Sequence, residues 1–214
     1  MRIKASFIVL LFLLLVVLFV LISINIFGMA FRKLGFPPEY SVYFLFLSLL
    51  GSYVNVPIKK VVSHVPAITG KGFHSSSYAS SLDVERSTAI NLGGAVIPVI
   101  MSLFLSTMVS LVDVLIGILV MTIIIHKIAR PVKGSGIAIH ALYPPLLAAA
   151  LALIISPQNA PIIAYISGTL GCLIGVDILN LKKIPDLGMK VVSIGGAGTF
   201  DTIFLTGIIS VLLA

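Results

Sequence analysis

Long apolar runs recur along this chain, each about as long as a helix that crosses a lipid bilayer. About 20 apolar residues span the hydrocarbon core as a helix, which satisfies its own backbone hydrogen bonds. Seven such runs can be read: Phe7–Phe31, Tyr40–Ile58, Ala89–Thr107, Ser110–Ile128, Ile137–Ile155, Ile162–Leu181 and Val192–Ala214. Only 10% of the residues are charged, against about 25% in soluble domains. The sequence therefore predicts an all-α, polytopic membrane protein with about seven transmembrane helices in a single domain, residues 1–214.

The basic residues fall almost wholly on one of the two faces that these runs define. Twelve of the fourteen Lys and Arg residues lie in the N-terminus and in the loops 59–88, 127–136 and 182–190, whereas the other face carries only Arg32 and Lys33. Cytoplasmic loops are the ones enriched in Lys and Arg. We therefore predict a multi-pass protein of the cell membrane, with a cytoplasmic N-terminus and an extracytoplasmic C-terminus. The Gly- and Ser-containing segment 59–88 is expected to be a flexible cytoplasmic loop.

The first apolar run has two interpretations. Its core exceeds 20 residues, whereas the apolar region of a signal peptide has roughly 7–15, which favours an uncleaved anchor. The small residues Gly28 and Ala30 keep cleavage open as the alternative. Cleavage would leave six spans and would not move the site predicted below.

Two parts of the chain resemble each other. The segments Ile90–Ala95 and Val192–Ala197 both end in Gly-Gly-Ala, and each follows an inward-running span and a Lys-Lys pair. This pattern predicts parallel repeats of three spans joined by one linker span, a 3+1+3 plan of the kind that builds some transporters. The alternative is that small residues recur because they let membrane helices pack closely. Both interpretations stay open here.

Asp177 and Asp201 are lone carboxylates inside the last two apolar runs. A charge within an apolar span costs about 2.5–3.5 kcal/mol on insertion scales, so such residues face the protein interior and mark functional sites. At 1.5 Å per residue, Asp177 lies about 7 Å and Asp201 about 13 Å from the cytoplasmic ends of their helices. Asn55, Asn91, Asn180 and His140 are expected at similar levels.

These six residues suggest a binding site for an ion or a small substrate. Carboxylate and amide oxygens are ligands that hard cations favour, and two close carboxylates are also suited to share a proton. We predict a bound cation or proton, with no other cofactor and no metal assigned. The structural alternative makes Asp177 a helix-end residue reaching Lys182 or Lys183, and gives Asp201 a backbone hydrogen bond. In that alternative Asn55, Asn91 and His140 bond between helices.

The segment Ser193–Asp201, with the sequence SIGGAGTFD, is the second informative element. Three glycines in four positions disfavour a regular helix. We expect a broken helix start at Gly195, Gly196, Gly198 and Thr199, with backbone N–H groups near the carboxylates. A break at membrane depth is tolerated only where it faces protein or water. The Lys-Ser/Thr ending of a phosphate-binding loop is missing, which makes nucleotide binding improbable.

Four stretches resemble a prokaryotic and archaeal family of integral membrane proteins of unknown function. They are Asn91–Pro98, Ala129–Gly136, Gly168–Leu181 with Asp177, and Ser193–Gly207 with Asp201. The resemblance covers most of the chain from about residue 40, and the last stretch is the most specific. Where the family usually has Gly after the second aspartate, this chain has Thr202. The resemblance implies a membrane protein and supplies no activity.

Three kinds of function fit these features. The first is a carrier or binding protein for a small solute or cation, whose 3+1+3 plan looks like that of small sugar carriers, although in the opposite orientation. The alternative is an intramembrane diaspartyl protease, in which one carboxylate activates water and the other protonates the leaving group. Presenilin-like and prepilin-peptidase families place Asp directly after Gly-x-Gly, however, and here Thr199 and Phe200 intervene. The third is a structural or accessory protein. The predicted partner is the lipid bilayer and not nucleic acid, and oligomer formation stays open.

Overall fold

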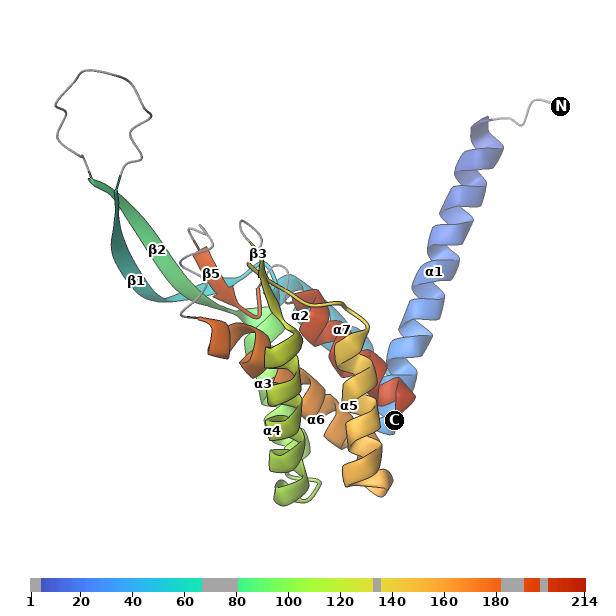
Figure 1. Ribbon diagram of the computed structural model, residues 1–214. Helices are drawn as coiled ribbons and strands as arrows, with labels where there is room; N and C mark the ends of the chain where they lie inside the picture. Colours follow the sequence, from blue (N-terminus) through green and yellow to red (C-terminus); the bar gives the residue numbers. More distant parts are fainter. Residues whose placement is uncertain (1–4, 67–80, 133–135, 182–190, 197–199) are drawn as a thin grey trace.

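The structure, a computed structural model, describes residues 5–66, 81–132, 136–181, 191–196 and 200–214. Within these residues the chain forms seven α-helices and five strands (Figure 1). The helices are α1 (Ala5–Lys33), α2 (Tyr40–Gly51), α3 (Ile97–Ser106), α4 (Leu111–Ile128), α5 (Tyr143–Ile155), α6 (Ala160–Cys172) and α7 (Phe200–Leu213). The strands are β1 (Asn55–Pro66), β2 (Ser81–Asn91), β3 (Arg130–Val132), β4 (Gly136–Ala138) and β5 (Val191–Ile194).

Short irregular helices connect several of these elements. Two are π-helical, η1 (Leu92–Val96) before α3 and η3 (Leu173–Asp177) after α6. Two are 3-10 turns, η2 (Pro157–Asn159) before α6 and η4 (Ile178–Asn180) after η3. Together with α6, the segments η2, η3 and η4 form one continuous helical stretch of 24 residues, Pro157–Asn180.

The predicted predominance of helices is confirmed, but several helices begin and end at other residues than predicted. Within the described residues, α4 and Pro157–Asn180 are long and apolar enough to cross a membrane. The stretches Tyr40–Gly51, Leu92–Ser106 and Tyr143–Ile155 are shorter apolar helices, as is Thr202–Leu213 in α7. The seven full-length spans therefore stay a prediction.

The all-α prediction is wrong where strands replace the expected ends of helices. β1 begins at Asn55 inside the second predicted span, β2 runs to Asn91 inside the third, and β5 occupies the start of the seventh. β1 and β5 are rich in Val and Ile, whose branched side chains favour strands. The predicted flexible loop 59–88 likewise contains strand residues at both ends, paired from Asn55↔Asn91 to Pro66↔Ser81. Its central part, 67–80, lies outside the described residues.

Helix α6 is the centre of the packed body. Ten of its thirteen residues are buried, and it contacts α3, α4, α5 and α7. Glycines permit the closest approach: a Cβ at Gly171 would lie 2.6 Å from Met121 Cγ, and one at Gly175 would lie 2.9 Å from the Thr122 carbonyl oxygen. The small residues of α6 therefore hold α4 at a short distance, as is common between membrane helices.

Two parts of the chain extend away from this body. The β1–β2 ribbon projects on one side of the helices, and α1 projects on the other, contacting α2 and α7 (Figure 1). β5 pairs in parallel with β2, which gives a three-stranded sheet in the order β1-β2-β5. Because both β2 and β5 lead into helices, this sheet brings two strand-to-helix transitions side by side, and the candidate site lies there.

Candidate functional site

The base of the three-stranded sheet gathers residues that are far apart in the sequence. Asn55 at the start of β1 is the register partner of Asn91 at the end of β2, and Ile90 pairs with Ile194 at the end of β5. All three strands therefore have an end at one place. We call Asn55, Asn91, Ser193 and Gly195 the strand-end junction.

Asn91 is the structural centre of this junction. Its side chain is 1% exposed and its Oδ1 accepts a hydrogen bond of 2.8 Å from the backbone N–H of Gly94, so Asn91 caps the first turn of η1. Its Nδ2 donates to the Ser52 carbonyl oxygen at 2.6 Å and to Asn55 Oδ1 at 3.1 Å. The amide thus ties the end of α2, the start of β1 and the start of η1 together.

Asn55 links this amide to β5. Its Oδ1 accepts from Asn91 Nδ2 and also from the Ser193 hydroxyl. Ser193 was not among the predicted site residues, although it occupies the position of Asn91 in the Ile90–Ala95 and Val192–Ala197 alignment. That correspondence was the signal that could have identified it.

Gly195 allows the chain to turn where β5 ends. Its φ of +70° lies in the left-handed region that favours glycine. A Cβ at this position would lie 2.6 Å from the Gly94 carbonyl carbon and 2.7 Å from the Ala95 nitrogen. The backbone of Gly195 is therefore packed directly on the backbone of η1, and a side chain there has no room.

Asp177 is brought to the same junction from the end of η3. Its side chain is only 4% exposed, and its Oδ2 accepts a hydrogen bond of 2.6 Å from the backbone N–H of Gly195. A buried carboxylate needs such donors because water no longer solvates it. The residues Leu173 and Val176 beside it belong to a buried cluster that also contains Ile203 of α7. Asp177 therefore faces the protein interior.

Asn180 has a different neighbourhood. Its Nδ2 donates to the carbonyl oxygens of Gly175 and Val176, both at 3.0 Å, which satisfies backbone groups at the irregular end of the helix. Nδ1 of His126 on α4 lies 3.2 Å from the Gly175 oxygen and 3.4 Å from Asn180 Nδ2. His126 was missed in the sequence because a lone histidine at the end of an apolar run carries no distinctive pattern.

Of the remaining predicted residues, His140 is not joined to this junction by the contacts of the described residues. His140 is exposed before α5, and its ring contacts that of Tyr143 at 4.9 Å between centroids. Asp201 lies in the first turn of α7, but its side chain lies outside the described part of the structure, as do Gly198 and Thr199 entirely. Gly196 follows Gly195, and its N–H donates to the Ser193 carbonyl oxygen at 3.1 Å.

The junction offers one buried carboxylate beside backbone and amide groups. Oδ1 and Nδ2 of Asn91 both form hydrogen bonds within the fold, so the role of this side chain is structural. In the described part of the chain, no three His, Cys, Asp or Glu side chains form a group that could hold a metal ion. A carboxylate such as that of Asp177 can bind a cation or accept a proton.

Comparison with known proteins gave one match. A family model described as a protein of unknown function, DUF1614, matches residues 49–213. This range contains the strand-end junction and Asp177. The comparisons with curated proteins and with solved structures gave no match.

Proposed function

The chain belongs to the DUF1614 family of proteins of unknown function, and we propose that it is a multi-pass membrane protein that binds a cation or a proton at Asp177. One observation carries the proposal: a carboxylate that is 4% exposed lies where the apolar helix 157–180 becomes π-helical, and it accepts a hydrogen bond from the backbone just after β5. Interrupted helices whose ends and backbone groups meet a buried charge are the way in which many membrane carriers build ion sites.

Support for membrane insertion comes from the outer face of α4. Its buried face packs on α6, yet its other face is apolar as well. The exposed residues on that face are Leu111, Val112, Leu115, Ile116, Leu119 and Ile123. A helix on the surface of a soluble protein would carry polar side chains there. An apolar face of this length is what contact with lipid requires.

Support for the proposed orientation comes from the arrangement of the strands. The β1–β2 ribbon, β3 and β5 lie on the same side of the helices, the side towards which the N-terminal end of α1 points (Figure 1). Lys59 and Lys60 lie in β1, Arg86 lies in β2 and Arg130 lies in β3. One basic side of this kind is expected of the cytoplasmic face, which would leave Arg32 and Lys33 outside.

The hydrogen bond from Gly195 supports a role for Asp177 beyond packing. A carboxylate oxygen that accepts a hydrogen bond can also bind a cation. The proposed cation binds the Asp177 carboxylate, with backbone carbonyl oxygens of the neighbouring segments as further ligands. Asp201, six residues after Gly195, is the proposed second carboxylate.

The direct test is binding to the full chain in lipid nanodiscs. We expect saturable binding of Na⁺, K⁺, Mg²⁺ or Ca²⁺ by calorimetry, or proton uptake on acidification, and we expect Asp177→Asn and Asp201→Asn to abolish it. Asp113→Asn is the matched control, because Asp113 lies half-buried in the first turn of α4. If Asp177→Asn folds and binds as the unmodified chain does, the proposal fails.

The parallel strand-to-helix units β2–η1–α3 and β5–α7 support the 3+1+3 repeat that we propose for the transmembrane region. Repeats of this kind carry substrate at the interface between them. The bond from Gly195 to Asp177 and the packing of Gly195 on Gly94 support a site there. Ion-dependent uptake of a solute into proteoliposomes would establish a carrier. Cleavage of a membrane peptide that either aspartate variant abolishes would instead establish the protease alternative.

A further inference from the structure

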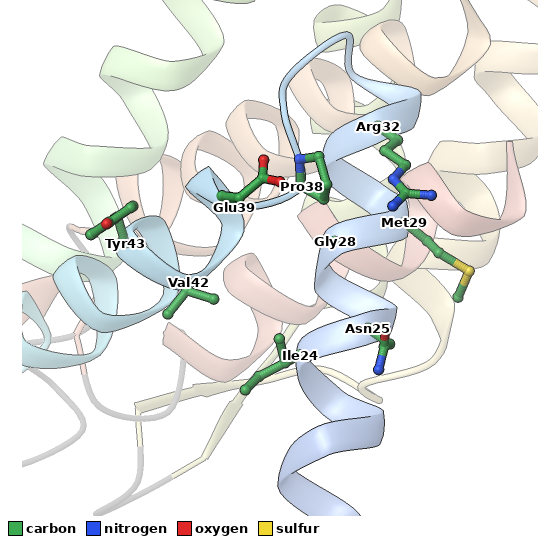
Figure 2. A pocket seen from close by; sticks show the side chains of 9 residues that line it. All are labelled: Ile24, Asn25, Gly28, Met29, Arg32, Pro38, Glu39, Val42 and Tyr43. Carbon is green, nitrogen blue, oxygen red and sulfur yellow. The ribbon is translucent and has the colours of Figure 1, made fainter.

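A cavity lies between the C-terminal part of α1 and the start of α2. Its volume is about 530 Å³, and its walls include Ile24, Asn25, Met29 and Arg32 from α1 and Glu39 and Val42 from the chain entering α2 (Figure 2). The approach of the two segments is close, since a Cβ at Gly28 would lie 3.2 Å from Pro38 Cβ. The cavity is therefore a built feature of the α1–α2 hairpin.

The cavity changes from apolar to charged along α1. Ile24 and Arg32 are eight residues apart, which corresponds to about 12 Å along a helix. Ile24 and Val42 line the apolar part, whereas Arg32 and Glu39 bring opposite charges from the two walls (Figure 2). Both charged side chains are exposed, and no ion pair joins them in the described part of the chain.

The neighbouring lysine is already engaged in the fold. Lys33 Nζ donates a hydrogen bond of 2.9 Å to the carbonyl oxygen of Leu212, near the C-terminal end of α7. This bond fixes α1 against α7 and leaves Arg32 as the cation that faces the cavity. A fixed helix with a guanidinium beside an open cavity suits an anionic oxygen ligand, because guanidinium binds phosphate in a bidentate manner.

We propose that this cavity binds a phospholipid with a zwitterionic ethanolamine head group. Arg32 binds the phosphate, Glu39 binds the ammonium, and one acyl chain lies along Ile24 and Val42. The inference rests on the membrane location proposed above, and it is independent of any role of Asp177. Arg32 and Lys33 are the two basic residues assigned to the extracytoplasmic face, so the lipid belongs to the outer leaflet.

Glu39 determines which phospholipid head group the cavity binds most tightly. An anionic phosphatidylglycerol would gain the same contact with Arg32, but it has no ammonium group to pair with Glu39 and its charge is repelled by that carboxylate. Phosphatidylcholine carries a quaternary ammonium that cannot donate hydrogen bonds to Glu39. Of these three head groups, only ethanolamine can form hydrogen-bonded contacts with both Arg32 and Glu39.

Native mass spectrometry of the full chain in detergent provides the test, with phosphatidylethanolamine and phosphatidylglycerol of equal chain length as probes. We expect phosphatidylethanolamine to bind more tightly, and Arg32→Gln to weaken it about fivefold, the equivalent of roughly 1 kcal/mol for a partly exposed ion pair. Glu39→Gln should remove the difference between the two lipids. Val42→Trp, which fills the cavity, should weaken both. Arg130→Gln, an exposed arginine on β3, is the control.

Two results would overturn the proposal. If both lipids bind the unmodified chain equally, Glu39 does not select the head group. If Arg32→Gln and Val42→Trp both bind lipid as the unmodified chain does, the lipid does not occupy this cavity. Inorganic phosphate is the third probe: if it competes with the lipid at equal concentration, the site binds a free anion and not a lipid. Loss of cation binding in Asp177→Asn with lipid binding retained would show that the two proposals are separate.

Discussion

The backbone N–H of Gly195 donates a hydrogen bond of 2.6 Å to Oδ2 of Asp177, although 18 residues separate them along the chain. This bond joins the end of β5 to the end of η3. Gly195 is also packed on the backbone of Gly94, so the buried carboxylate is connected to both strand-to-helix transitions. A change in the charge of Asp177 would therefore act on the two π-helical segments η1 and η3 at once.

Gly195→Ala should destabilise the protein more than an ordinary glycine substitution. The left-handed backbone costs an L-residue about 1–2 kcal/mol, and overpacking against Gly94 and Ala95 adds about 1–3 kcal/mol. The free energy of unfolding, measured by SDS titration in mixed micelles, should fall by the sum of the two.

Gly35→Ala is the matched control for this substitution. Gly35 has a φ of +86°, but a Cβ there would meet nothing within 4 Å. Gly35→Ala should lower the free energy of unfolding only by the cost of the left-handed backbone, about 1–2 kcal/mol. Equal losses in the two variants would show that the close contact between Gly195 and η1 does not contribute.

Asn91→Ala should also destabilise the fold, because it leaves the Gly94 N–H and the Ser52 carbonyl oxygen without their partner. An unsatisfied buried group costs about 1–3 kcal/mol. Asn159→Ala is the control, since Asn159 precedes α6 but makes no capping bond with its side chain. Thermal unfolding followed by circular dichroism should show a lower midpoint for Asn91→Ala alone. An equal midpoint in both variants would contradict the central place of Asn91.

The sequence alone allowed residues to be selected more readily than their contacts. The length of the apolar runs sufficed to predict α4 and the 162–181 helix, because burial and lipid contact both demand apolar side chains there. The same apolar character concealed β5 and the end of β2, since Val and Ile suit a buried strand as well as a membrane helix. Asp177 and Gly195 were both selected for their chemistry. Their bond depends on the pairing of β2 with β5, which links residues about a hundred positions apart and leaves no local pattern.

Gly175→Ala should disturb the packing of α4 on the helix that ends at Asp177. Its Cβ would lie 2.9 Å from the Thr122 carbonyl oxygen, a backbone atom that cannot move away by changing rotamer. At Gly117, in the same interface, the nearest atom is Ser167 Cβ at 3.0 Å, and the next lies at 3.5 Å. We therefore expect Gly175→Ala to cost more stability than Gly117→Ala, within the range of about 1–3 kcal/mol for overpacking. The reverse order in SDS unfolding would refute this.

Leu119→Lys tests whether the outer face of α4 contacts lipid. Leu119 is 61% exposed in the middle of α4, and Leu111 is 62% exposed at its first residue. In water both substitutions would be harmless, since surface changes are usually within about 0.5 kcal/mol. In a bilayer, a lysine at the helix centre costs about 2.5–3.5 kcal/mol, whereas a lysine at the end reaches the interface with its long side chain. The fraction of α4 inserted by the translocon, measured with engineered glycosylation sites on either side, should fall for Leu119→Lys and change little for Leu111→Lys. Equal insertion of both variants would mean that this apolar face is not in the hydrocarbon core.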